Sequence, residues 1–306
     1  MSIVEKAIGK MRSEARSAAP VEPFRRPDAA PHGRGEARPE SRSDGAERAP
    51  RSIDECVSVC APLQIDIEAL RSAGALPPQD IERQIADEYR RIKWPLLEKA
   101  FGRAAGALPE GNLVMVTSAV PGDGKTFTSI NLALSIARER DSSVLLIDAD
   151  IAKAHVSELL GIRQRPGLTD LLENPGTNPA DAILATDIDG LRVMAAGRRS
   201  DQVPELMASQ RMRDLIAELG ARNRDRVIIF DSSPLLATNE AQVLAKLVGQ
   251  VLMVVRANGT PRPAVEEAVA LLDRSRSISV VLNQLRPLFG LGSYYSGYYN
   301  YGGSHS

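Results

Sequence analysis

The sequence predicts an α/β fold in which a mostly parallel β-sheet is covered by helices on both faces. Apolar runs typical of buried strands alternate with segments of helical periodicity over most of the chain. A glycine-rich loop joins the first of these strands to a helix. Two later strands end in aspartates, and the ligand site of such a sheet lies at the carboxyl ends of its strands.

The composition is that of a soluble globular protein, with 43% hydrophobic and 25% charged residues among 306. The formal net charge of -1 argues neither for nor against a nucleic-acid partner. No apolar run approaches the roughly 18–20 residues that span a bilayer, and the N-terminus lacks the apolar core of a secretory signal. We therefore expect a cytoplasmic protein. Cys56 and Cys60 lack the companion ligands of a zinc site, so two reduced thiols are expected.

Two segments precede the predicted domain. Residues 1–16 carry apolar residues at helical spacing, and Ser2 with Glu5 resembles a capping box. This amphipathic helix either docks on a partner or membrane surface or is a frayed terminal helix without a fixed partner. Residues 17–52 are predicted to be a disordered Pro/Arg-rich linker, because they contain too few large apolar residues to offset the entropy of ordering.

Residues 53–290 are predicted to form the folded domain. Apolar periodicity returns over residues 53–67, as a strand or an extended lead-in. A helix is predicted over residues 79–103, in which Pro95 should bend or interrupt the helix.

The phosphate-binding loop is the most specific motif of the sequence. It covers residues 119–126, Ala-Val-Pro-Gly-Asp-Gly-Lys-Thr, after a predicted strand at 113–118 and before a helix that continues to Ala137. Glycines let such a loop turn its N–H groups toward phosphate oxygens, and the helix N-terminus adds partial positive charge. The motif predicts a P-loop NTPase-type fold that binds ATP and Mg²⁺. The predicted nucleotide-binding residues are Pro121, Gly122, Asp123, Gly124, Lys125, Thr126 and Phe127.

The remaining elements follow in the order expected of a parallel sheet. Strands are predicted at 143–150, 191–196, 226–234, 250–255 and 277–283. A loop at 197–204 and a helix at 205–220 separate the second and third of these strands.

Three aspartates at predicted strand ends supply the acidic groups of the site. Asp231 ends its strand in the manner of a Walker B acid, and Asp148 and Asp150 end another. Carboxylates and the Thr126 hydroxyl are ligands that Mg²⁺ prefers, while a carboxylate also accepts a proton from an attacking hydroxyl. The alternative for each aspartate is a helix N-cap that follows a strand. Lys125, Asp148, Asp150 and Asp231 are therefore the candidate catalytic residues.

Residues 291–306 form a tyrosine-rich tail that is expected to be flexible. Five of the six tyrosines of the chain lie there, among Gly, Ser and Asn and without apolar periodicity. Beside a nucleotide site they are predicted to be phosphate acceptors, and the alternative is an aromatic tail used for assembly. The candidate acceptors are Tyr294, Tyr295, Tyr298, Tyr299 and Tyr301.

On these motifs the chain resembles the bacterial tyrosine kinases of exopolysaccharide and capsule biosynthesis, and looks most like the autokinases of exosortase-associated clusters. The resemblance covers residues 53–306 and rests on the loop, on 146–150, on 228–234 and on the tail. It implies ATP-dependent tyrosine autophosphorylation between neighbouring subunits of a ring. By matching positions, Thr126, Asp150 and Asp231 would hold the metal, Lys125 the phosphates, and Asp148 would be the base.

The resemblance also implies partners. A membrane chain-length determinant, or co-polymerase, would activate the kinase and hold it peripheral to the inner membrane, and a cognate tyrosine phosphatase would oppose it. The chain departs from the family at Ala152, where an arginine is usual, with Lys153 next. The helix through which family members pack aligns with Asp87, Arg90 and Lys93, or those charges form a solvated helix face.

Three other functions compete with a kinase. Partition-type ATPases of the same fold carry a second lysine early in the loop, where this chain has Val120. An ATP-gated scaffold would bind ATP without transferring phosphate. A nucleic-acid-binding ATPase needs a basic stripe on its core, whereas the basic excess here lies mainly in the linker, so no nucleic-acid partner is expected.

Overall fold

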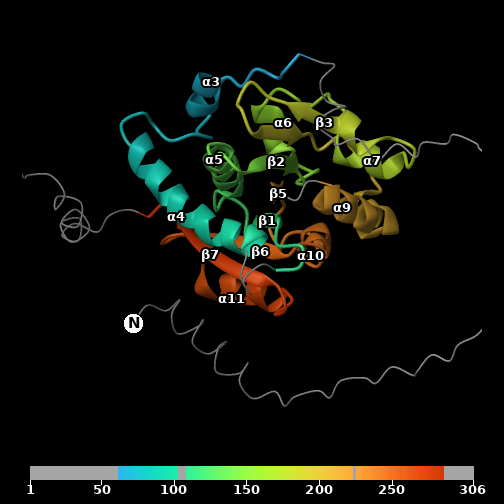
Figure 1. Cartoon of the computed structure of the whole chain (residues 1–306). Coiled ribbons are helices and arrows are strands. Elements are labelled where there is room, and N and C mark those ends of the chain that lie inside the picture. Colours follow the sequence, from blue (N-terminus) through green and yellow to red (C-terminus); the bar gives the residue numbers. More distant parts are fainter. Residues whose placement is uncertain (1–60, 103–107, 223–224, 286–306) are drawn as a thin grey trace, which may run out of the picture. The chain divides into compact units, whose positions relative to one another are not determined.

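A computed structural model of the chain describes residues 61–102, 108–222 and 225–285 (Figure 1). These residues all belong to one compact unit. The predicted segments 1–16, 17–52 and 291–306 lie outside the described residues.

One sheet organises the described part of the chain, with seven strands in the order β3-β4-β2-β5-β1-β6-β7. Neighbouring strands are parallel except for β3, which is antiparallel to β4. The strands are β1 Leu113–Ser118, β2 Ser143–Asp148, β3 Ile183–Ala185, β4 Leu191–Met194, β5 Arg226–Asp231, β6 Gln250–Arg256 and β7 Ser277–Asn283. This confirms the predicted mostly parallel sheet.

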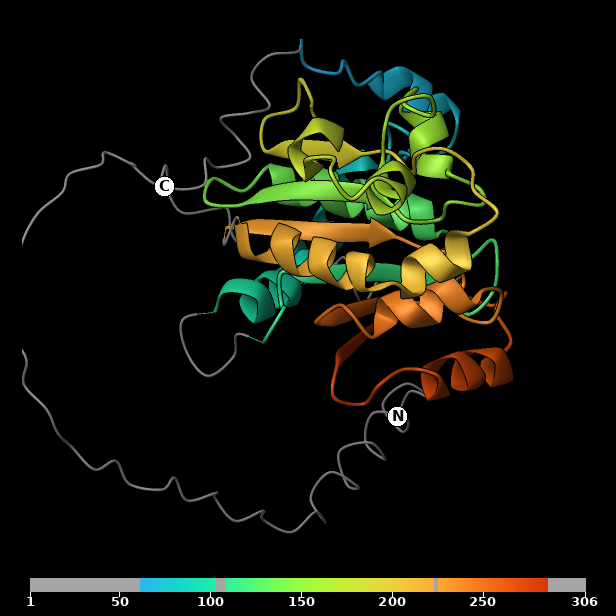
Figure 2. The same cartoon turned by 90° about the vertical axis from the view of Figure 1, so that its right-hand side faces the viewer.

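Helices cover both faces of the sheet, as Figure 1 shows, with α4 and α5 on one side and α9 and α10 on the other. Figure 2 looks onto the second side, where helices lie in front of the central strands. The helices are α3 Ile67–Ser72, α4 Glu82–Phe101, α5 Lys125–Ala137, α6 His155–Leu159, α7 Leu168–Glu173, the 3₁₀ helix η2 Pro179–Ala182, α8 Val203–Ala208, α9 Gln210–Arg222, α10 Asn239–Ala245 and α11 Arg262–Ala270. None of the helices in the described ranges has the length and apolar content that a bilayer crossing requires.

Alternate residues of the central strands pack into two hydrophobic cores, one on each face of the sheet. Met115, Ile147 and Phe230 point to the core under α7 to α11. Their neighbours Val116 and Leu146 point to the core under α3 to α6. Strands buried on both faces need apolar residues at nearly every position, which explains why these segments are continuous apolar runs.

The strand ends differ slightly from prediction. β2 ends at Asp148, so Asp150 lies in the turn that follows and not in the strand. β4 ends at Met194, and β5 ends at Asp231. The short strand β3 was not predicted, because three residues carry no readable periodicity.

Of the two outcomes predicted at Pro95, a bend or an interruption, the interruption is wrong, and a second helix prediction also needs correction. Pro95 does not interrupt α4, because Tyr89, Lys93 and Leu96 on either side of it are buried and hold the helix against the domain. The predicted helix 205–220 is two helices that break at Ser209, whose backbone is extended. The Ser209 hydroxyl donates to the carbonyl of Leu206 and accepts from an N–H of the next helix, so it ends one helix and starts the other.

The described beginning of the lead-in is extended. Leu63 forms an isolated parallel bridge with Thr186, beside β3. Ile67, predicted to be extended, instead begins α3, because the Asp66 carboxylate accepts from the N–H of Ala69 and caps the helix.

Candidate functional site

The phosphate-binding loop lies at the carboxyl end of β1 and runs directly into α5. Gly122 and Gly124 have φ of 87° and 94°, in the left-handed region that favours glycine. Gly124 is the N-cap residue, and Lys125 is the first residue of α5. The loop and the helix N-terminus therefore have the backbone conformation that an anion-binding turn requires.

Lys125 is a buried cation among carboxylates. Only 8% of the residue is exposed. Burial lowers the pKa of its ammonium group, while the charges of Asp231 and Asp150 raise it again, and nearby Lys153 lowers it further. A lysine held in this way presents a poorly solvated charge to an incoming phosphate.

Two hydroxyl groups of α5 donate hydrogen bonds to the Asp231 carboxylate. Thr126 Oγ1 donates to its Oδ2 at 2.8 Å, and Ser129 Oγ donates to its Oδ1 at 2.8 Å. Burial, and then the charge of Asp148, raise its pKa to about 7, although the two hydroxyls act in the opposite direction. The Walker B acid and the threonine predicted to ligate Mg²⁺ are thus in direct contact.

Asp148 is the register partner of Asp231 on the neighbouring strand, so the two carboxylates lie side by side. Ser157, at the start of α6, donates both its N–H (2.8 Å) and its hydroxyl (2.7 Å) to Asp148 Oδ2. The Oδ1 atom has no hydrogen-bond partner among the described residues. Burial raises the pKa of Asp148 to about 6, against the effect of the Ser157 bonds.

Asp150 lies in the turn after β2 and is also buried. Its Oδ1 accepts from the hydroxyl of Ser233 at 2.9 Å, which ties this turn to the segment that follows β5. The structure therefore brings Asp148, Asp150 and Asp231 together at the carboxyl ends of β2 and β5, as the strand pattern predicted, with Asp150 and Asp231 near Lys125.

The other predicted nucleotide-binding residues lie on the loop and in the first turn of α5. Pro121 and Gly122 are exposed, whereas Asp123 is 2% exposed. The ring of Phe127 packs 6.5 Å from that of Tyr89 on α4, between centroids. A nucleotide contact of Phe127 stays a prediction, and its ring has a packing role.

Three hydroxyl groups of the site were missed from the sequence: Ser129, Ser157 and Ser233. Ser129 follows Thr126 by three residues on α5, and this spacing places both on one helix face, so it was the one that could have been found. Ser157 and Ser233 bind aspartates on other elements, and their short polar side chains give no periodic signal.

The donor set fits a hard divalent cation such as Mg²⁺. Carboxylate and hydroxyl oxygens lie around the loop, and two carboxylate oxygens, Asp148 Oδ1 and Asp123 Oδ2, are buried without a hydrogen-bond partner among the described residues. Within the described ranges no group of three or more His, Cys, Asp or Glu could hold a metal. A cation here would therefore also need phosphate oxygens and water, which is how Mg²⁺ usually binds at nucleotide sites.

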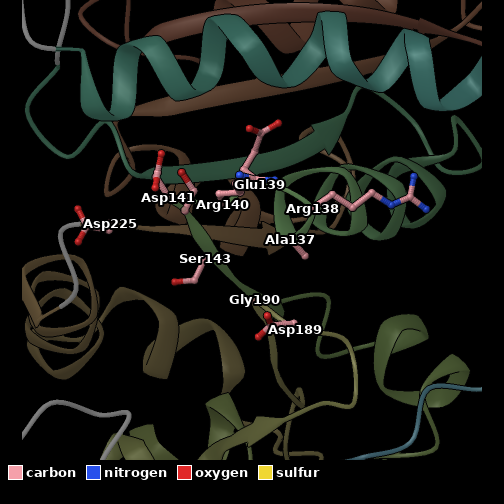
Figure 3. Close-up of a pocket in the computed structure, with 10 residues that line it drawn as sticks. Ala137, Arg138, Glu139, Arg140, Asp141, Ser143, Asp189, Gly190 and Asp225 are labelled. Atoms are coloured by element: carbon pink, nitrogen blue, oxygen red, sulfur yellow. The ribbon is translucent and has the colours of Figure 1, made fainter.

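A cavity of about 610 Å³ lies at the opposite end of the sheet (Figure 3). It is lined by residues of the α5–β2 connection, including Arg138 and Asp141, by Ser143 at the start of β2, and by Asp189 and Asp225. Because these residues come before β2, β4 and β5, the cavity is at the amino ends of the strands and is separate from the phosphate loop.

One of the three charged residues predicted to take part in packing between subunits is instead used within the subunit. Lys93 is buried, and its Nζ donates to the carbonyl of Ser135 and pairs with Glu139 at 2.6 Å. Arg90 is exposed and pairs with Asp87 on the same helix. Lys93 thus holds α4 to α5 within the subunit, and the solvated face is limited to the other two charges.

Comparison with known proteins agrees with this site. The family described as "CobQ/CobB/MinD/ParA nucleotide binding domain" matches residues 114–286. The tyrosine-protein kinase Wzc of Salmonella typhimurium is 33% identical over 195 residues, which are 63% of this chain and 26% of Wzc. The tyrosine-protein kinase YwqD of Bacillus subtilis is 31% identical over 56% of this chain and 71% of YwqD. The chain thus spans only about a quarter of the length of some of its curated relatives.

Solved structures show the same likeness. The VpsO kinase domain is 33% identical with a TM-score of 0.54, over 65% of this chain and 98% of that domain. The kinase domain of the Escherichia coli tyrosine kinase ETK is 30% identical with a TM-score of 0.54, over 59% of this chain and 70% of that one. The chain therefore belongs to the CobQ/CobB/MinD/ParA nucleotide-binding domain family, and within it to the bacterial tyrosine kinases.

Proposed function

We propose that this protein is an ATP-dependent protein-tyrosine autokinase that phosphorylates its own C-terminal tyrosine cluster. The observation that carries this proposal is the contact between Thr126 and Asp231, which joins the phosphate loop to the Walker B acid. Kinases of the P-loop type place these two groups on the metal that bridges the nucleotide phosphates. The tyrosine-rich sequence of residues 291–306 supplies the acceptors.

In the proposed reaction the bond between the γ-phosphorus of ATP and its bridging oxygen breaks, and a bond from that phosphorus to a tyrosine oxygen forms. The products are ADP and phosphotyrosine. The tyrosine proton passes to a carboxylate, for which Asp148 is the candidate, since its Oδ1 has no other partner among the described residues. Its raised pKa of about 6 brings this base closer to neutral pH.

The other residues bind and orient. Lys125 holds the β- and γ-phosphates, and the loop N–H groups surround them. Thr126, Asp150 and Asp231 would hold Mg²⁺, which supplies positive charge to the phosphate oxygens. Ser233 and Ser129 keep two of these carboxylates in place, at 2.9 Å and 2.8 Å.

We further propose that transfer occurs between subunits of a homo-oligomeric ring and serves exopolysaccharide polymerisation or export. The activator would be the cytoplasmic segment of a membrane-bound chain-length co-polymerase, which would keep the kinase at the membrane, and a tyrosine phosphatase would reverse the reaction. The family membership supports these proposals. The ion pair of Arg90 and Asp87 on α4 is exposed and therefore accessible to a neighbouring subunit.

One feature favours a kinase over a partition-type ATPase. Val120 occupies the loop position where such ATPases carry a lysine that reaches a dimer partner. Its side chain instead packs against the core under α7 to α11. This chain therefore has no cation at that position to offer to a second subunit.

The test is mass spectrometry of the intact C-terminal peptide after the full chain is incubated with ATP and Mg²⁺, alone and with the activator segment. We expect several phosphates on the five tail tyrosines of the wild type and none in Lys125→Met. Deletion of residues 294–306 should remove most of the incorporated phosphate and leave ATP binding intact.

The controls separate a kinase from a scaffold. Thermal unfolding should show that Lys125→Met is folded, and calorimetry should show that the tail deletion still binds ATP. A wild-type tail that stays unmodified with the activator present, in a chain that binds ATP, would identify an ATP-gated scaffold instead.

A further inference from the structure

The phosphate loop contains a negative charge that no step of the proposed reaction uses. Asp123 lies between the two glycines of the loop, yet it is only 2% exposed. Its Oδ1 accepts from the Thr260 hydroxyl at 2.6 Å, and its backbone carbonyl accepts from Asn283 Nδ2 at 2.9 Å. Its Oδ2 has no hydrogen-bond partner among the described residues.

The two groups that hold Asp123 come from the edge of the sheet. Thr260 ends the turn after β6, and its hydroxyl is oriented by the N–H of Arg256 at 3.1 Å. Asn283 ends β7, and its Oδ1 accepts from the N–H of Gln284 at 2.9 Å. Both side chains are therefore fixed by their own strand ends before they reach the loop.

The contact is close enough to require glycine next to it. A Cβ atom on Gly124 would lie 1.9 Å from Asn283 Nδ2, so any other residue there would force the Asn283 amide to move. The amide of Asn283 thus packs directly on the turn whose N–H groups would face the phosphates. This places the loop and the ends of β6 and β7 in one hydrogen-bonded unit.

A free aspartate in this position would oppose phosphate binding in two ways. Aspartate side chains readily accept hydrogen bonds from backbone N–H groups a few residues away, so the carboxylate could occupy the donors that phosphate needs. Its charge would also repel the phosphate oxygens, strongly so where water is excluded. The loop therefore needs an interaction that holds this carboxylate away from the N–H groups of the loop.

We infer that Thr260 and Asn283 are positioning residues, which hold Asp123 against the sheet edge and so keep the loop open for the nucleotide phosphates. The inference rests on the proposed nucleotide site and adds residues to it. The two residues act through Asp123 and need not touch the nucleotide.

The first test compares Thr260→Val with Thr260→Ser in the full chain. Valine keeps the shape of threonine without the hydroxyl, and serine keeps the hydroxyl. Titration calorimetry with ATP-Mg²⁺ and with ADP should show about tenfold weaker binding for Thr260→Val, the effect of losing one hydrogen bond to a charged group. Thr260→Ser should bind within about twofold of wild type.

The second test repeats the substitution without the carboxylate. In an Asp123→Ala background, Thr260→Val should change nucleotide affinity by less than about twofold, because no carboxylate is left to release. If the same tenfold loss persists there, Thr260 acts only through its own turn and the inference is wrong. Equal affinity of Thr260→Val and wild type would also overturn it.

These outcomes are distinct from failure of the proposed function. A folded wild-type chain that binds no nucleotide, judged by calorimetry and thermal unfolding, would overturn both the site and the positioning role. A wild type that binds ATP but transfers no phosphate would overturn the kinase alone, because every comparison above measures binding.

Discussion

The two ends of the sheet carry the same kinds of residue in opposite states. At the carboxyl ends, Asp148 and Asp231 are 0% and 1% exposed and are bound by serine and threonine hydroxyls. At the amino ends, Asp189 and Asp225 line an open cavity and are exposed (Figure 3).

Burying a carboxylate is unfavourable unless partners compensate for the lost water. At the carboxyl ends two carboxylates are buried on adjacent strands, and burial raises the pKa values of Asp148 and Asp231 above the usual range. The contrast shows that acid content alone does not mark a functional site. A carboxylate that is buried with incomplete compensation does mark such a site, because binding of a cation and phosphates can relieve the unfavourable burial.

The largest effect should come from changing Asp231, one of the proposed metal ligands. Asp231→Asn should reduce tail phosphorylation at least about 100-fold, because it removes the charge opposite Thr126 and Lys125. The matched variant at the other end, Asp225→Asn, should leave the rate unchanged. Initial rates of phosphate incorporation into the tail measure both, and equal losses would mean that the two ends do not differ in function.

Asp148→Asn should have the next largest effect, and it should change both the rate of phosphate transfer and the stability of the protein. Phosphate transfer should fall about 10- to 100-fold with little change in ATP affinity, since the proton acceptor is lost and the phosphate contacts stay. The nucleotide-free protein should become more stable above pH 7 by roughly 2 kcal/mol, because one buried like charge is gone. Calorimetry and rate measurements on one preparation compare the loss of ATP affinity with the loss of rate. Equal losses of rate and affinity would make Asp148 a structural or metal residue.

The pH dependence of stability should sharpen the comparison. With pKa values of about 6 and about 7 in the folded state, Asp148 and Asp231 bind more protons there than in the unfolded chain. The free energy of unfolding of the nucleotide-free protein should therefore fall as pH rises from about 4 to about 7, and the contribution should stay lost above that range. Urea titrations at several pH values measure it, with Asp148→Asn as the flatter control.

The smallest expected effect is at Ser157. Ser157→Ala removes one of two donors to Asp148 Oδ2, together with the acceptor of the Ala196 N–H, and should destabilise the protein by about 1–2 kcal/mol at neutral pH. Ser142→Ala, at the amino-end cavity, should stay within about 0.5 kcal/mol of wild type. If denaturant midpoints show equal effects, Ser157 does not compensate the buried carboxylate as described.

The sequence was sufficient for the sheet, the loop and the strand-end acids, and the reason is periodicity. Strands buried on both faces are continuous apolar runs, and the glycines of the loop are required by local backbone conformation. What could not be predicted depends on contacts between distant segments. Ser233 binds Asp150 from 83 residues away, and Thr260 binds Asp123 from 137 residues away.

The same limit explains the errors in the helices. Pro95 stays within α4 because burial of its neighbours outweighs the local disruption. The break at Ser209 depends on two hydrogen bonds of a single hydroxyl. Local propensity cannot rank these tertiary contributions, since each is of similar size to the propensity itself.

The sheet order also determines when this site can form. β1 carries the phosphate loop, yet its neighbours β5 and β6 are made much later, and the Thr117 hydroxyl reaches a carbonyl 116 residues ahead. During synthesis the loop therefore leaves the ribosome before β5 and β6, the strands that enclose β1. Pairing over such separations makes folding slow, and chains truncated before β6 should expose apolar strand surface and be targets for chaperones.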